Sequence, residues 1–133
     1  MKKPTLDHIG IAVRSIKGAR VYEALGLTVD HVETVQTQGV RTAFLSVGES
    51  NLELLEPLSP ESTVAKFIEK RGEGIHHICL RVDDIDAHLA RLKALGFRLI
   101  NEAPVPGAHG CRVAFLHPSA GGGVLIELSE KAE

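Results

Sequence analysis

The stretch that decides the fold is Asp7-His8-Ile9-Gly10-Ile11-Ala12-Val13, because it returns later as His76-His77-Ile78-Cys79-Leu80-Arg81-Val82. Two other stretches return in the same order. Residues 38–45 are matched by residues 109–116, and residues 51–56 are matched by residues 125–130. A repeat of half the chain indicates two similar structural units that share one core.

The two copies pair side chains that can do chemistry. Their spacing grows slowly, from 69 residues between His8 and His77 to 74 residues between Glu53 and Glu127, so insertions fall between elements rather than within them. Two histidines and two carboxylates on matched strands would converge naturally on a metal ion.

Composition excludes several classes of function. The chain has 133 residues, 44% of them hydrophobic and 24% charged, which is ordinary for a globular protein with one core. A formal net charge of −2 gives no general attraction for nucleic acid or an anionic membrane. No apolar run approaches the roughly 18 residues that suggest a membrane span, and no signal segment follows Lys2-Lys3. We therefore expect a cytoplasmic protein, with Cys79 and Cys111 reduced.

Hydrophobic periodicity predicts a β-α-β-β-β order in each unit. We expect strands over 6–13, 27–34, 40–47 and 51–56 with a helix over 16–25, and then strands over 76–82, 97–102, 111–117 and 124–129 with a helix from Asp83-Asp84 to about residue 95. A linking helix is expected over 62–70. Gly26 and Gly96 are the expected helix caps. The prediction is one domain over residues 1–133, with unit 1 at about 5–57, the linking helix at about 61–71 and unit 2 at about 74–130.

Strand alternation places both histidines opposite a packing stripe. Successive side chains of a strand point to opposite faces. Ile78, Leu80 and Val82 share one face, so His77 lies on the other, and the matching strand places His8 in the same way.

The same test places Glu53 and Glu127 opposite the leucines of their strands. A carboxylate in such a setting is costly to desolvate unless it is paired, protonated or bound to metal. A single strand histidine is more often structural, and a strand glutamate usually faces water. Neither explanation accounts for both types recurring at matched positions. Two imidazoles and two carboxylates suit a divalent transition metal with open positions, without separating Co, Mn, Ni, Fe and Zn.

The remaining histidines divide by position. His76 shares the apolar face of its strand and is expected to be structural. His31 and His88 are expected at the surface. His109 and His117, on or beside the strand over 111–117, are candidates for a substrate role.

Paired βαβββ units with His and Glu at these places resemble the vicinal oxygen chelate superfamily, which includes glyoxalase I, extradiol dioxygenases and the fosfomycin- and bleomycin-resistance proteins. Stretches across nearly the whole chain are, more narrowly, similar to the methylmalonyl-CoA epimerases. They are residues 7–13, Glu53-Leu54-Leu55-Glu56-Pro57-Leu58, residues 72–78, Pro106-Gly107-Ala108-His109-Gly110, Phe115-Leu116-His117-Pro118 and residues 122–128. The resemblance implies an α+β protein of the vicinal oxygen chelate fold, with two tandem βαβββ units forming a curved mixed sheet around a metal site.

By motif match, the metal ligands of that family fall on His8, Glu53, His77 and Glu127. The resemblance implies metal-dependent epimerisation of methylmalonyl-CoA at C2, by proton abstraction and return through a metal-stabilised enolate. It implies Glu127 and Glu53 as the acid/base groups, with Glu127 favoured. Some relatives carry a carboxylate where this chain has Thr42, which cannot serve as a base.

The implied cofactor is a divalent ion, cobalt first, with manganese, nickel or zinc as alternatives. The implied partners are methylmalonyl-CoA and a second copy of the chain in a homodimer, with no nucleic acid and no membrane. The alternative functions are a glyoxalase I-like lyase and a bleomycin-resistance-type binding protein. The first would need a glutathione site, and the second generally lacks the metal ligands.

Overall fold

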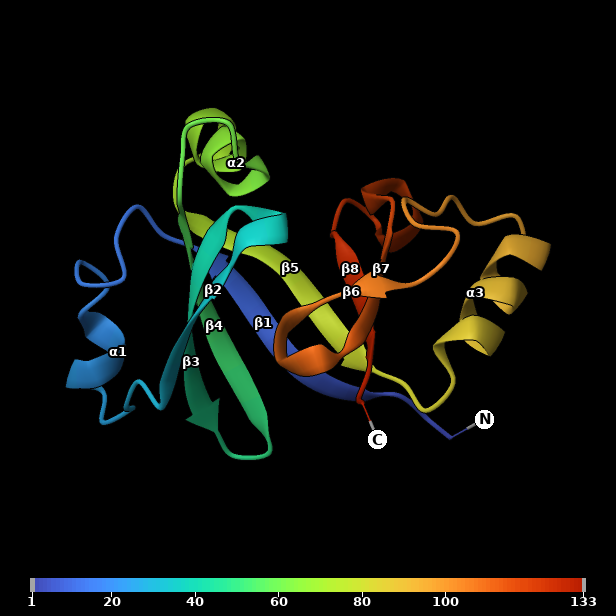
Figure 1. Cartoon of the computed structure of the whole chain (residues 1–133), viewed down its shortest axis with the longest axis horizontal. Helices are drawn as coiled ribbons and strands as arrows, with labels where there is room; N and C mark the ends of the chain where they lie inside the picture. The colour runs from blue at the N-terminus through green and yellow to red at the C-terminus, as the bar shows by residue number, and fades with distance from the viewer. Residues whose placement is uncertain (1, 133) are drawn as a thin grey trace. The chain divides into compact units, whose positions relative to one another are not determined.

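The repeat seen in the sequence returns as two structural units in the computed structural model, which describes residues 2–132 (Figure 1). The first unit is His8–His76, and the second unit joins the chain up to Asp7 with the chain from His77 onward. The described part of the chain contains no helix that is long and apolar enough to cross a membrane.

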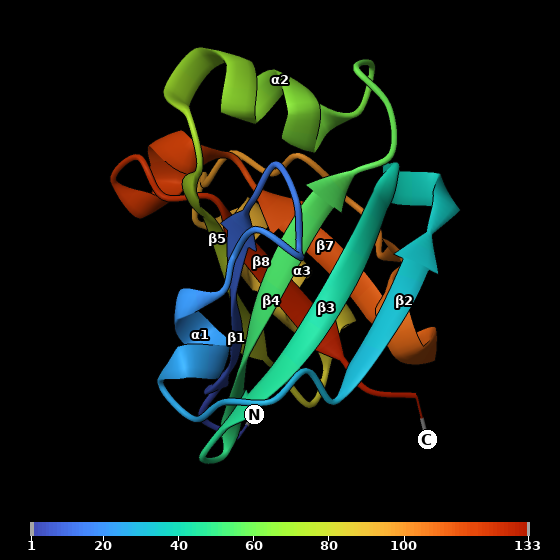
Figure 2. The same ribbon diagram turned by 90° about the vertical axis from the view of Figure 1, so that its left-hand side faces the viewer.

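The first unit is built on strands β1 to β4. Its elements are β1 (Thr5–Ala12), α1 (Val21–Ala24), β2 (His31–Val35), the 3-10 turn η1 (Gln36–Gln38), β3 (Val40–Val47), β4 (Ser50–Pro57) and α2 (Thr63–Arg71). The strand order is β2-β3-β4-β1, and Figure 2 shows β2, β3 and β4 side by side. The pairs β2–β3 and β3–β4 are antiparallel, whereas β4 and β1 are parallel.

The second unit repeats this plan. Its elements are β5 (Gly74–Arg81), α3 (Ile85–Ala94), β6 (Val105–Pro106), η2 (Ala108–Gly110), β7 (Arg112–Leu116), η3 (Pro118–Gly121) and β8 (Ile126–Glu130). The strand order is β5-β8-β7-β6, again with one parallel pair, β5–β8, and antiparallel pairs elsewhere. The β-α-β-β-β order predicted for each unit is therefore confirmed.

The helices pack their apolar residues against the strands in both units. In the second unit, Ile85 and Leu89 of α3 pack with Val82 and Leu128. In the first unit, the predicted linking helix is α2, which begins after Ser62, whose hydroxyl accepts a hydrogen bond from the Ala65 N–H at 3.0 Å. Its buried residues Val64 and Ile68 join a cluster with Ala12 and Leu55. His76 lies edge-on to Phe67 of α2, with 5.0 Å between ring centroids, so it packs as predicted.

The predicted helix over 16–25 is much shorter in the structure. Only Val21–Ala24 is helical, and the residues before it form turns in which Gly18 donates to the Ser15 carbonyl and Ala19 to the Ile16 carbonyl. Glycine is a poor helix former, which favours turns at this point. Gly26, with φ +98°, and Gly96, with φ +86°, end α1 and α3 in the backbone region that glycine favours, as predicted.

The predicted strand over 97–102 is wrong. Of these residues only Leu99 makes a bridge, to Leu116, and the short strand beside β7 is β6 at Val105–Pro106. Ile100 and Asn101 both donate their N–H groups to the single carbonyl of Phe115, and the Asn101 side chain accepts the Phe115 N–H at 2.8 Å. A side chain has taken the place of a backbone partner, so a regular ladder does not continue. β2 is also shorter than the predicted 27–34.

Candidate metal centre

The first unit brings one imidazole and one carboxylate into contact. β1 and β4 run parallel with Gly10 beside Glu53, and His8 lies two residues earlier on β1. The His8 Nδ1 is 2.8 Å from Glu53 Oε2. His8 is only 6% exposed and Glu53 only 8%, so both are withdrawn from water. Gly10 has no side chain to fill the space beside the carboxylate.

The second unit makes the matching pair. β5 and β8 are parallel, with Cys79 beside Glu127 and His77 two residues earlier. The His77 Nε2 is 3.0 Å from Glu127 Oε1, and the exposed fractions are 5% and 7%. The repeat therefore conserves the register as well as the residue types within each unit.

The predicted packing stripes are confirmed on the faces opposite these residues. Ile11, Val13 and Leu54 belong to one hydrophobic cluster in the first unit. Leu80, Val82 and Leu128 belong to the corresponding cluster in the second unit. Because strand side chains alternate, His8, Glu53, His77 and Glu127 are held on the other face of their strands by this packing.

Two aromatic side chains beside the carboxylates were missed by the sequence analysis. Phe44 is directly opposite Glu53 in the β3–β4 pair, and Phe115 is directly opposite Glu127 in the β7–β8 pair. Residues directly opposite in an antiparallel pair lie on the same face with adjacent side chains. The Phe115 ring is also edge-on to His77, at 6.0 Å between centroids. The sequence repeat could have identified them, because Phe44 and Phe115 occupy equivalent positions in the matching stretches 38–45 and 109–116.

Thr42 lies on the same strand face as Phe44, two residues earlier, and is buried. Thr42 pairs with Leu55, which is two residues after Glu53 on β4, so Thr42 and Glu53 lie on the same face of the sheet. Its counterpart in the second unit is the buried Val113, opposite Ser129. Neither side chain can accept a proton as a base, which leaves Glu53 and Glu127 as the buried carboxylates of these faces among the described residues.

The chemistry of each histidine–glutamate pair fits a divalent cation. The carboxylates of Glu53 and Glu127 carry two negative charges when ionised, and each already contacts a ring nitrogen. Two buried negative charges are costly unless protons or a cation neutralise them. Imidazole and carboxylate are both ligands for first-row transition metals.

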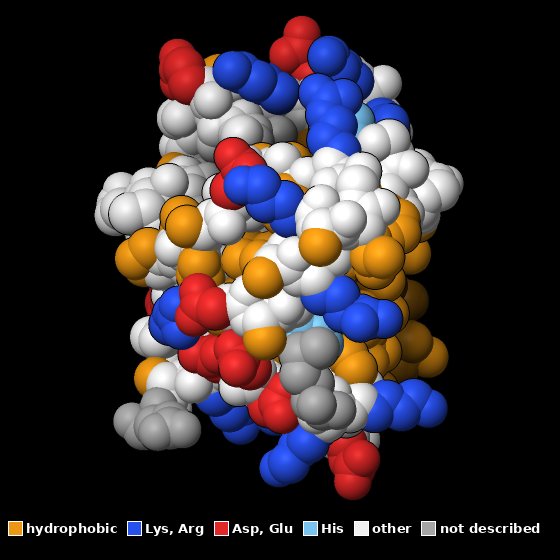
Figure 3. Space-filling view, turned by 90° about the vertical axis from the view of Figure 1, so that its right-hand side faces the viewer, with side chains coloured by type: hydrophobic (Ala, Val, Ile, Leu, Met, Phe, Trp, Pro, Cys, Tyr) orange, Lys and Arg blue, Asp and Glu red, His pale blue; other side chains and the backbone are white. Residues whose placement is uncertain are grey.

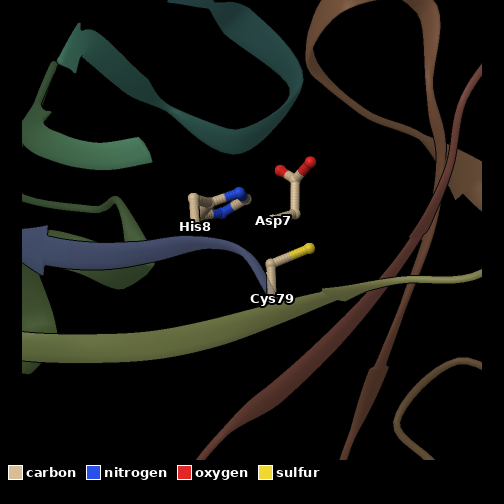
Figure 4. Close-up of side chains that lie close together, drawn as sticks. All are labelled: Asp7, His8 and Cys79. Atoms are coloured by element: carbon tan, nitrogen blue, oxygen red, sulfur yellow. The ribbon is translucent and has the colours of Figure 1, made fainter. Parts of the chain in front are cut away.

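A further ion pair holds the start of β1 within the second unit. Arg81 donates from Nε and Nη2 to the same Asp7 carboxylate oxygen, with Nε at 3.0 Å. In Figure 4, the Asp7 carboxylate and the Cys79 thiol project to the same side. Cys79 is fully buried and Cys111 is half-buried, and both cysteines are reduced, as predicted. Asp7 immediately precedes His8, so the Arg81 contact restrains the strand that carries this histidine.

Four other histidines belong to neither histidine–glutamate pair, and they differ in exposure and in contacts. His31 is exposed, as predicted, and stacks on Phe44 with 5.7 Å between centroids. His88 is half-buried rather than on the surface as predicted, with its ring Nε2 withdrawn from solvent. His109 is exposed, with φ +57° in η2. His117 caps η3, with Nδ1 accepting the Ser119 N–H at 3.0 Å.

Comparison with known proteins shows the family to which the chain belongs. The family model described as the Glyoxalase/Bleomycin resistance protein/Dioxygenase superfamily matches residues 7–115. An ethylmalonyl-CoA/methylmalonyl-CoA epimerase of Cereibacter sphaeroides is 40% identical over 129 residues, covering 94% of this chain and 96% of that protein. The crystal structure of methylmalonyl-CoA epimerase from Mycobacterium tuberculosis is 42% identical with a TM-score of 0.90, covering 96% of this chain and 88% of that one.

A further solved structure is a methylmalonyl-CoA epimerase in complex with methylmalonyl-CoA and NH4+. It is 40% identical with a TM-score of 0.92, covering 98% of this chain and 96% of that one. The chain therefore belongs to the Glyoxalase/Bleomycin resistance protein/Dioxygenase superfamily. Within that superfamily it belongs to the methylmalonyl-CoA epimerases. This confirms the predicted resemblance, the vicinal oxygen chelate fold and the class of enzyme, an epimerase.

Proposed function

We propose that the protein epimerises methylmalonyl-CoA at C2, with a divalent ion held by His8, Glu53, His77 and Glu127. The observation that carries the proposal is the repeated buried contact between one histidine and one glutamate, at 2.8 Å in one unit and 3.0 Å in the other. Membership of the epimerase family supplies the substrate, because relatives of this name are similar over nearly the whole chain. We propose cobalt as the native ion, with manganese, nickel and zinc as alternatives.

Epimerisation needs a proton removed from one face of C2 and returned to the other, which calls for two acid/base groups. The buried carboxylates that we assign to these roles are Glu127 and Glu53. A divalent ion in the site would act as a Lewis acid and stabilise negative charge that develops on the substrate oxygens. His8 and His77 orient the carboxylates through the contacts that they make. Phe44 and Phe115 place apolar surface beside each carboxylate, which limits the access of water.

The decisive experiment for this proposal follows the C2 proton directly. Methylmalonyl-CoA is incubated in D2O with the protein and either Co2+ or a chelator, and the C2 hydrogen is observed by NMR. We expect rapid exchange with Co2+ and almost none with the chelator. Formation of lactoylglutathione from the glutathione adduct of methylglyoxal, without C2 exchange, would instead identify a glyoxalase. A protein without bound metal and without either reaction would favour a binding protein of the bleomycin-resistance type.

We also propose that the protein is a cytoplasmic homodimer. The reduced thiols of Cys79 and Cys111 suit a reducing compartment. In the strand order of their units β2 and β6 are terminal, and both carry an exposed valine, Val32 and Val105. Exposed strand edges are commonly covered by a partner.

For the dimer, we expect sedimentation equilibrium at micromolar concentration to give twice the mass of one chain, 14.3 kDa. Adding Co2+ is expected to leave this mass unchanged, because the proposed ligands all come from one chain. A mass of one chain at this concentration would contradict the dimer and leave the proposed metal site standing.

A further inference from the structure

A second pair of repeat-matched glutamates lies three residues beyond the proposed ligands. In the first unit, Glu56 Oε1 accepts the backbone N–H of Ile16 at 2.9 Å. Its other oxygen, Oε2, lies 3.6 Å from Nη1 of Arg41. Glu56 therefore joins the end of β4 both to the chain that follows β1 and to β3.

The second unit makes the same connections more tightly. Glu130 Oε2 accepts the backbone N–H of Ile85 at 2.9 Å, and Oε1 accepts from Arg112 Nη1 at 3.0 Å. Arg112 also donates to Asp86 of α3 at 2.8 Å. These hydrogen bonds, to Asp86 first and to Glu130, raise the pKa of the Arg112 guanidinium above its ordinary value. Figure 3 shows the face that carries α3, where acidic and basic side chains lie next to one another.

The correspondence between the two arrangements extends to the backbone. In the first unit, a backbone hydrogen bond from the Val13 N–H to the Leu55 carbonyl, 3.0 Å long, joins the ends of the parallel strands β1 and β4 next to the Glu56 contact. The second unit has the same bond from Val82 to Ser129, at 2.9 Å. We call each glutamate with its arginine and its backbone N–H a carboxylate latch. Each latch closes the end of the two strands that carry the histidine and the glutamate of its unit.

The latch and the ligand use opposite faces of one strand. Glu130 is the third residue after Glu127, which is about 10 Å along a strand and an odd number of steps. Glu130 therefore shares the face of Leu128, on the helix side, whereas Glu127 lies on the other face. The latch does not touch the proposed ligands, so any effect on them must pass through the strand.

We propose that Glu56 and Glu130 are positioning residues, which hold the glutamate strand in register against the histidine strand and thereby maintain the histidine–glutamate contacts of the proposed metal site. This inference rests on the proposed function, because it concerns the same ligand set. Both oxygens of Glu130 face donors, and an amide would replace one acceptor with an NH2 group. Glu130→Gln therefore sets donor against donor, either at Ile85 N–H or at Arg112, and the strand end must move to relieve it.

The first test needs no metal. We expect the imidazole nitrogen shifts of His77 in metal-free Glu130→Gln to move from the wild-type values, and those of His8 to move in Glu56→Gln, as seen by 15N NMR. Each variant is expected to affect mainly the histidine of its own unit. The second test is Co2+ titration, in which Glu130→Gln should weaken binding about tenfold, the lower end of the effect of residues that orient metal ligands.

Two control variants separate positioning from general stability. Glu102→Gln removes the same charge from an exposed ion pair with Lys93, 2.9 Å long, and should leave the His77 shifts and Co2+ affinity unchanged. Leu45→Ala opens a core cluster of the first unit that contains no residue of β5 or β8, with an expected loss of about 2–5 kcal/mol of stability. If Leu45→Ala, still folded, alters the His77 shifts as much as Glu130→Gln, the latch is only a stabilising contact and the proposal is overturned.

Unchanged His77 shifts in folded Glu130→Gln would also overturn the latch. Failure of the proposed function has a different appearance. If Glu130→Gln changes the His77 shifts but the wild-type protein binds no Co2+, the latch is supported and the proposed metal site is refuted.

Discussion

Glu127→Gln is expected to lower the rate of C2 proton exchange on methylmalonyl-CoA by about 10²–10⁴-fold, the usual contribution of general-base catalysis. The amide keeps an oxygen and nearly the same volume at a position that is closely packed against His77 and Phe115. It removes the basic carboxylate. We therefore expect Co2+ to remain largely bound while exchange is lost.

The measurement pairs NMR observation of the C2 hydrogen in D2O with metal analysis of the same sample. Glu53→Gln is the matched control, since it makes the same change at the repeat-related position. Its effect should be milder, because Glu127 is the favoured acid/base group of the two. Wild-type exchange in Glu127→Gln with metal bound would make Glu127 a ligand only, and the base would then have to be sought at His109 or at a bound water.

Loss of metal is the second large effect that we expect, in His8→Ala and His77→Ala. Substitutions of residues that only orient metal ligands commonly cost 10–100-fold in affinity, so removal of a ligand itself should cost more than about 100-fold. Each change also leaves a buried glutamate without its imidazole partner. A chelator should reproduce the effect in the unaltered protein by abolishing C2 exchange.

Metal content after dialysis, together with Co2+ titration, checks this expectation. His88→Ala is the control, because His88 of α3 belongs to neither histidine–glutamate pair. It should retain wild-type metal content. Full occupancy and full activity in both His8→Ala and His77→Ala would refute the proposed site. Binding of Co2+ should also release protons, since ligands must be deprotonated to bind, and proton release should shrink in both variants.

The strand faces, the linking helix and the order of the elements could be predicted from periodic patterns in the sequence. Alternation assigned His8 and His77 to faces opposite the apolar stripes, and the packing of Val13 and Val82 agrees with it. The same is true of the linking helix, whose apolar spacing and N-terminal Ser62 are local signals. The repeat also predicted the β-α-β-β-β order, because similar segments in similar order fold into similar units.

Other features depend on partners that are distant in sequence. Asn101 accepts the Phe115 N–H, and this side-chain bond ends the ladder where apolar residues predicted a strand. The positions of Phe44 and Phe115 opposite the carboxylates follow from the pairing register, which hydrophobicity alone does not specify to one residue.

The carboxylate latches belong to the same class. Glu56 and Glu130 read as ordinary polar positions of strands, yet each accepts a backbone N–H about 40 residues away, with separations of 40 and 45 positions. The sequence by itself determined which residues recur and which face of a strand they occupy, because both follow from local periodicity. Only the tertiary structure decided which donors meet which acceptors, because hydrogen bonds between distant segments form where the folded backbone brings them together.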